Sequence, residues 1–75
     1  MREMEEIKLR DEYIKLGQAL KVCGIAQSGV EAKIMIQEGQ VCVNGQPELQ
    51  RGKKLHDGDV ITCQGRTIQI KGHDH

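Results

Sequence analysis

A group of basic side chains gives this sequence its clearest capacity for chemistry, which is the binding of anions. The 75-residue chain has no net charge, yet residues 14–54 carry six basic and three acidic side chains, while both ends are acidic. Arg binds phosphate through a bidentate fork, and Lys binds it as a mobile point charge. The basic middle segment can therefore serve as an anion-binding surface on a neutral protein, although charge alone favours an ordinary solvated surface. The candidate contacts are Lys21, Lys33, Arg51, Lys53 and Lys54.

A second anion-binding feature lies at residues 28–31. The segment Ser28-Gly29-Val30-Glu31 matches a capping box, in which Ser28 accepts from a backbone amide and Glu31 reaches back to the cap. The free amides and the positive dipole end of a helix that begins here favour a phosphate group. Gly29 also allows an anion to approach the backbone closely. Ser28 and Gly29 therefore join the candidate contacts.

The other reactive side chains favour structural roles. Three cysteines are odd in number, widely spaced and without a Cys-x-x-Cys pair, which favours buried reduced thiols over disulfides or zinc. They are Cys23, Cys42 and Cys63. Asp57-Gly58-Asp59 is more typical of a tight turn than of an acid–base pair. His73 and His75 alone do not make a metal site. The sequence also lacks a nucleophile–base pattern, so we expect no enzyme, metal or cofactor.

Two helices are predicted to position the basic residues. The first extends from Leu16 to Cys23, whose apolar side chains recur at i, i+3, i+4 and i+7, and a glycine follows as its stop. The second begins after the Ser28 cap and ends at Gly39. Its apolar side chains predict a wide buried stripe made of Val30, Ala32, Ile34, Met35 and Ile36.

The rest of the chain is predicted to be β-structure. Alternating residues indicate strands at 6–10, 41–43, 60–63 and 67–70. Asn44-Gly45 is the strongest short hairpin signal, and Pro47 disfavours a central strand after it. Residues 51–54 form a basic loop, and residues 71–75 a frayed tail.

These elements predict one α+β domain over residues 1–75, with two packed helices against a small, mostly antiparallel sheet. The chain lacks an apolar run long enough for a signal peptide or a membrane span. We therefore expect a cytoplasmic monomer.

As a set, the motifs resemble the S-four (S4) domain, an RNA-binding module also called the alpha-L motif. The resemblance covers about residues 14–63 and rests on the two helices, Val43-Asn44-Gly45, Arg51-Gly52-Lys53-Lys54 and Asp57-Gly58-Asp59. It is similar to the stand-alone YaaA/YbcJ-like branch, in which the domain is nearly the whole protein. The resemblance implies RNA binding by the two-helix face and the adjoining loop. Many members have Arg after the Ser that begins the second helix, where this chain has Gly29.

We therefore expect non-catalytic binding of structured RNA through phosphate contacts. With Tyr13 as the sole aromatic residue, base stacking is expected to contribute little. The resemblance favours ribosomal RNA, with transfer RNA as the alternative. A protein–protein adaptor with an incidental basic loop is a second hypothesis. A ubiquitin-like sulfur carrier is a third, which the tail Lys71-Gly72-His73-Asp74-His75 disfavours because it lacks a terminal di-glycine.

Overall fold

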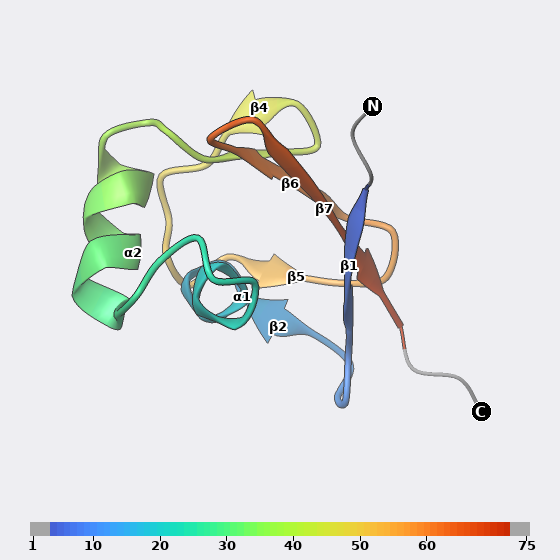
Figure 1. Ribbon diagram of the computed structural model, residues 1–75. Helices are drawn as coiled ribbons and strands as arrows, with labels where there is room; N and C mark the ends of the chain where they lie inside the picture. Colours follow the sequence, from blue (N-terminus) through green and yellow to red (C-terminus); the bar gives the residue numbers. More distant parts are fainter. Residues whose placement is uncertain (1–3, 73–75) are drawn as a thin grey trace.

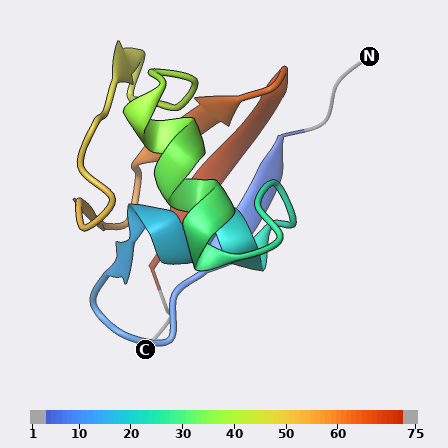
Figure 2. The ribbon, with the colours of Figure 1, turned by 90° about the vertical axis from the view of Figure 1, so that its left-hand side faces the viewer.

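The computed structural model describes residues 4–72, which form two helices and two sheets (Figure 1). The helices α1 (Leu16–Val22) and α2 (Gly29–Gln37) lie in front of the larger sheet when the molecule is turned (Figure 2). This arrangement confirms the predicted α+β class. No helix within residues 4–72 has the length and apolarity to cross a membrane.

The helix ends follow the local sequence. Gly24, with a φ of 81°, ends the turn after α1, because a left-handed backbone favours glycine. At the start of α2, the Ser28 hydroxyl accepts from the Glu31 amide at 3.2 Å. The Glu31 carboxylate accepts from the Gln27 amide at 2.9 Å, so it reaches one residue farther back than the predicted capping box. The predicted start of α2 is confirmed.

The wide apolar stripe predicted for α2 is wrong in part. Ala32, Met35 and Ile36 are buried, but Val30 and Ile34 are 68% and 48% exposed. Successive residues of a helix turn by about 100°, which places Val30 and Ile34 nearly opposite Ala32. Only one of the two apolar faces of α2 can therefore meet the core.

The larger sheet has the strand order β1-β7-β6-β3-β4. Its strands are β1 (Glu5–Lys8), β3 (Cys42–Val43), β4 (Gln46–Pro47), β6 (Val60–Cys63) and β7 (Arg66–Lys71). All neighbouring strands are antiparallel except β1 and β7, so the mostly antiparallel sheet is confirmed. Pro47 lies in the edge strand β4. An edge strand tolerates proline, because the missing N–H costs the sheet no hydrogen bond there.

Tight turns join the antiparallel strands. Asn44 and Gly45 both have positive φ, 53° and 85°, as a two-residue type I′ hairpin requires. This confirms the predicted hairpin. Gln64 and Gly65 repeat the pattern between β6 and β7, with φ values of 54° and 75°.

The C-terminal end differs from its prediction. Lys71 belongs to β7, and the Gly72 amide donates to the Asp57 carboxylate at 2.7 Å, so the ordered chain extends past the expected end at Ile70. The remainder of the predicted tail, residues 73–75 with both terminal histidines, lies outside the described residues.

A second, two-stranded sheet has no counterpart in the sequence prediction. Strand β2 (Ile14–Lys15) pairs antiparallel with β5 (Lys54–Leu55), immediately before α1. The pairing fastens the end of the predicted basic loop to the start of the first helix.

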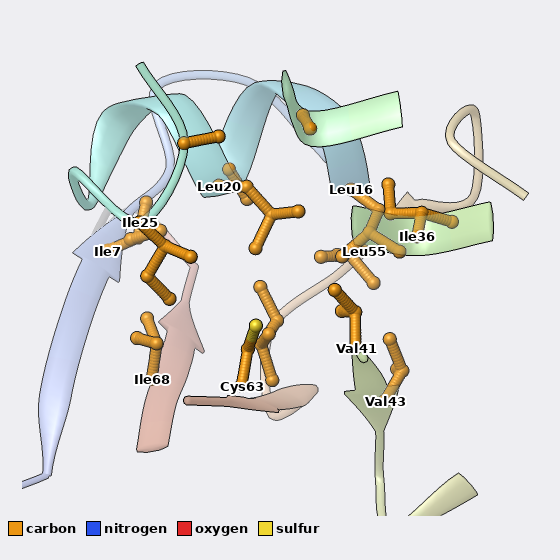
Figure 3. Close-up of a cluster of buried hydrophobic side chains, with 14 of the residues drawn as sticks. Ile7, Leu16, Leu20, Ile25, Ile36, Val41, Val43, Leu55, Cys63 and Ile68 are labelled. Carbon is orange, nitrogen blue, oxygen red and sulfur yellow. The ribbon is translucent and has the colours of Figure 1, made fainter. Parts of the chain in front are cut away.

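The core lies between the helices and the larger sheet (Figure 3). Its largest fully buried side chains are Leu16, Leu20, Ile36, Val41, Leu55, Ile61, Ile68 and Ile70. Cys63 is buried among them, and this burial raises the pKa of its thiol. Cys23 and Cys42 are only half-buried, so the prediction of buried thiols is correct for one of the three. All three thiols are free.

Candidate nucleic-acid interface

An open hollow of about 400 Å³ lies where α1, the start of α2 and the basic loop meet. We call it the basic hollow. Its lining residues are Lys15, Gly17, Gln18, Lys21, Gly29, Arg51 and Gly52. All charged side chains among these described residues are cations, and three lining residues are glycines that leave the backbone uncovered. The hollow therefore combines positive charge with room for an anion at the backbone.

The first turn of α1 positions the basic loop. The Leu16 amide donates to the Lys53 carbonyl at 2.8 Å, and the Gly17 amide donates to the Arg51 carbonyl at 3.0 Å. The first amides of a helix have no partner inside the helix, and Lys15 at the N-cap offers no side-chain acceptor. The loop carbonyls thus satisfy these amides, and this holds Arg51 next to α1.

Gly17 allows the Arg51 side chain to lie close to α1. A Cβ atom at position 17 would stand 2.6 Å from Cγ of Arg51, which is too close for two carbon atoms. The φ of Gly17 is unexceptional, so backbone conformation does not require glycine here. The close approach of the Arg51 stem does.

Two other cations of the basic loop, Lys53 and Lys54, do not line the basic hollow. Lys54 faces Lys15 across the β2–β5 pair, and its Nζ lies 4.9 Å from the centre of the Tyr13 ring. This is a cation–π distance, at which the Tyr13 ring attracts the Lys54 ammonium group. Lys53 is exposed, and its charge contributes to lowering the pKa of Asp59.

The structure brings together three of the seven predicted contacts, since Lys21, Gly29 and Arg51 all line the basic hollow. Lys33 is exposed on α2 one turn after Gly29, outside the lining. The hydroxyl of Ser28 is used in the helix cap. The sequence prediction missed Lys15 and Gly17. Lys15 is positioned by the β2–β5 pair, and Gly17 contacts Arg51, which is distant in the sequence.

The turn at residues 56–59 has the structural role predicted for it. The Asp59 carboxylate accepts from the His56 amide at 2.7 Å and from the Asn44 side chain at 3.0 Å. Asn44 in turn accepts from the Val60 amide at 2.9 Å. Partial burial acts to raise the pKa of Asp59, but the hydrogen bonds from His56 and Asn44 outweigh it and lower the value. No group of three metal-ligating side chains gathers within residues 4–72.

The charged group of Arg66 makes its contacts within the protein. Its guanidinium donates to both carboxylate oxygens of Glu5 and, at 2.7 Å, to the carbonyl of Cys23. It thereby joins β7 to β1 and to the end of α1. The hydrogen bond from Arg66 lowers the pKa of Glu5.

Known proteins have sequences similar to that of this chain. The chain is 44% identical over 59 residues to the probable ribosome maturation protein RlbA of Bacillus subtilis (strain 168), covering 79% of this chain and 83% of that protein. It is 36% identical over 58 residues to the putative RNA-binding protein YbcJ of Escherichia coli (strain K12), covering 77% and 83%.

The fold has a solved counterpart. The solution structure of YbcJ from E. coli, described as containing an alpha-L motif involved in RNA-binding, superposes with a TM-score of 0.71 at 33% sequence identity. The match covers 95% of this chain and 91% of that one. The family model described as the S4 domain matches residues 7–71, a longer stretch than the motif residues 14–63. This chain belongs to the S4 domain family of RNA-binding domains.

Proposed function

We propose that this protein binds structured ribosomal RNA without catalysing a reaction, and that it does so by phosphate contacts centred on the basic hollow. The observation that carries the proposal is the convergence of Lys15, Lys21 and Arg51 around exposed glycine backbone, with no acidic side chain among the described lining residues. Phosphate contacts supply most of the affinity in non-specific binding of nucleic acids and orient the protein on its target.

The start of α2 adds hydrogen-bond donors to this surface. The amides of Gly29 and Val30 make no hydrogen bond within residues 4–72, because the Ser28 cap serves the amide of Glu31. Unpaired amides at a helix N-terminus bind phosphate, and the helix dipole favours its charge. The missing side chain at Gly29 leaves these donors open to an RNA backbone.

The neighbouring cations extend the proposed contact surface. Lys33 lies along α2, while Lys53 and Lys54 lie beside α1 on the basic loop, and all three are exposed. A face of this kind reads the shape and charge of a folded RNA, since A-form helices are recognised mainly by phosphate and ribose contacts.

Ribosomal RNA is the proposed target because the relative RlbA carries the name of a probable ribosome maturation protein. Transfer RNA is the alternative RNA. The three free thiols fit action in the reducing cytoplasm. We expect one copy of the chain to suffice for binding.

One observation favours the protein–protein adaptor as a second candidate function. Val30 and Ile34 lie one turn apart on α2 and are both exposed. Adjacent exposed apolar side chains are typical of protein contacts rather than RNA contacts. This face could serve a protein partner either beside the RNA contact or in place of it.

Crosslinking in cells, followed by sequencing of the attached RNA, tests the proposed function. The test variant is Lys21→Gln with Arg51→Gln, and the control is Lys71→Gln, which removes a cation of β7 that does not line the basic hollow. We expect ribosomal RNA with the wild type and the control, and much less with the test variant. Equal crosslinking by both variants, recovery of protein without RNA, or recovery of transfer RNA alone would contradict the proposal.

A further inference from the structure

A second hollow, of about 470 Å³, lies between the end of β1 and α1. We call it the Tyr13 hollow. Its apolar lining includes the buried Ile7 and Leu9 of the N-terminal segment, as well as Ile14 and Tyr13. The volume falls in the range of small-molecule binding sites, about 300–1,000 Å³.

Tyr13 lines this hollow. It is the single aromatic residue of the chain other than histidine, and it is 38% exposed. Lys54 lies over the ring, and the His56 ring is tilted by 51° at a centroid distance of 6.1 Å. Lys54 on the basic loop and His56 just after it hold this partly exposed ring in place, which makes it a platform for stacking.

The two hollows differ in charge. The basic hollow has cations and no acidic residue among its described lining, whereas in the Tyr13 hollow Lys8 and Arg10 are balanced by Glu6 and Asp11. A balanced, partly apolar hollow suits a neutral planar group better than a phosphate. The basic hollow suits a phosphate.

Gln18 joins the hollows, because it lines both. Its carboxamide makes no hydrogen bond within residues 4–72 and offers both a donor and an acceptor. Tyr13 and Lys15 are also two residues apart, at most about 7 Å along an extended chain. One nucleotide can therefore span from a ring contact in one hollow to a phosphate contact in the other.

We propose that the Tyr13 hollow binds an unpaired nucleobase, stacked on Tyr13 and hydrogen-bonded to Gln18, while phosphates of the same RNA occupy the basic hollow. This inference rests on the proposed function and adds to it a second site with a different ligand chemistry. The RNA ligand that follows from this inference has a bulged or unpaired nucleotide beside a duplex.

Three RNAs test this inference: a fully paired duplex, the same duplex with one bulged adenosine, and the same bulge with an abasic nucleotide. We expect the wild type to bind the adenosine bulge about tenfold more tightly than the abasic bulge, since stacking of one base on an aromatic ring changes affinity by a factor of roughly 5 to 150. The fluorescence of Tyr13, the only Tyr in a chain without Trp, should be quenched by the adenosine bulge alone.

Two variants make the test specific to the ring. Tyr13→Ala should lose the preference for adenosine over the abasic bulge while it still binds the duplex, and Tyr13→Phe should keep the preference. Equal binding of the adenosine and abasic bulges by the wild type, or an unchanged preference in Tyr13→Ala, would overturn the base site alone. Failure of the wild type to bind any of the three RNAs would overturn the proposed function together with it.

Discussion

Gly29 limits the charge that the basic hollow presents. Its φ is not left-handed, and no atom lies within 4 Å of the place where a Cβ would stand, so the site has room for a side chain. We expect Gly29→Arg to add one phosphate contact at the start of α2. With a slope of about −0.9 in log affinity per log salt, one contact raises affinity roughly eightfold at ~0.1 M salt. RNA titrations at several salt concentrations would measure this gain.

The control for this gain is Gly29→Ala. This change improves helix propensity by up to about 1 kcal/mol and adds no charge, so it should raise stability without raising RNA affinity. If Gly29→Ala and Gly29→Arg bind RNA equally well, position 29 does not face phosphate.

The residues of the basic hollow differ in how far the sequence could predict them. Lys21 and Gly29 were predictable, because helical periodicity and the capping box place them locally. Gly17 and Lys15 were not, because their roles depend on contact with the distant basic loop through Arg51 and Lys54. Nothing in the local pattern at Gly17 indicates that an Arg stem packs against it.

At the scale of elements, the Glu5–Arg66 pair connects β1, β7 and the end of α1. Its hydrogen bond lowers the pKa of Glu5 in the folded state below the ordinary value of 4.5. At a pH between the lowered pKa of Glu5 in the folded state and its ordinary pKa, the unfolded chain binds more protons than the folded chain. Stability therefore falls as the pH falls through this window. The stabilisation is fully present above about pH 5, and it weakens in high salt because the pair is partly exposed.

Urea unfolding between pH 7 and pH 2 measures this dependence. Arg66→Gln should be less stable than the wild type at pH 7, and the difference should shrink as the pH falls below 4.5. The matched variant Lys71→Gln breaks the looser Lys71–Glu6 pair, which is 4.0 Å long, and should have a smaller effect. A constant difference between the wild type and Arg66→Gln at all pH values would contradict the assignment.

The two apolar faces of α2 give a second prediction at this scale. Ile36 is fully buried and Ile34 is about half exposed, although they are two positions apart in one helix. Ile36→Ala should lower the free energy of unfolding by about 2–5 kcal/mol, whereas Ile34→Ala should lower it by less than about 1 kcal/mol. Equal losses in urea unfolding would contradict the orientation of α2.

The elements differ in how far sequence patterns could predict them. The β6 strand was predictable at its exact bounds from alternation, and the β3–β4 hairpin from Asn44-Gly45. The strands β2 and β5 have two residues each, too few for alternation to appear. The parallel pairing of β1 with β7 joins the two ends of the described chain, and such long-range pairing leaves no local signature.

For the whole molecule, a net charge of zero conceals a separation of charge between surfaces. The basic loop and both helices contribute cations to one region, while Arg66 and Lys71 pair with Glu5 and Glu6 at the β1–β7 edge. Long-range attraction to RNA is therefore weak, and affinity depends on close contacts at the basic hollow. Such contacts release counterions from the RNA and make binding strongly dependent on salt.

The measurement that tests the account most directly is the affinity for a structured RNA as a function of salt. Contacts to four or five phosphates give a slope of log affinity against log salt near −4, with about −0.9 for each phosphate. Replacing Lys21 and Arg51 by Gln should flatten the slope by about 2, and so should replacing Lys53 and Lys54 by Ala, whereas the control Lys71→Gln should leave it unchanged. The account is contradicted if the wild type does not bind at ~50 mM salt, or if all variants keep its slope.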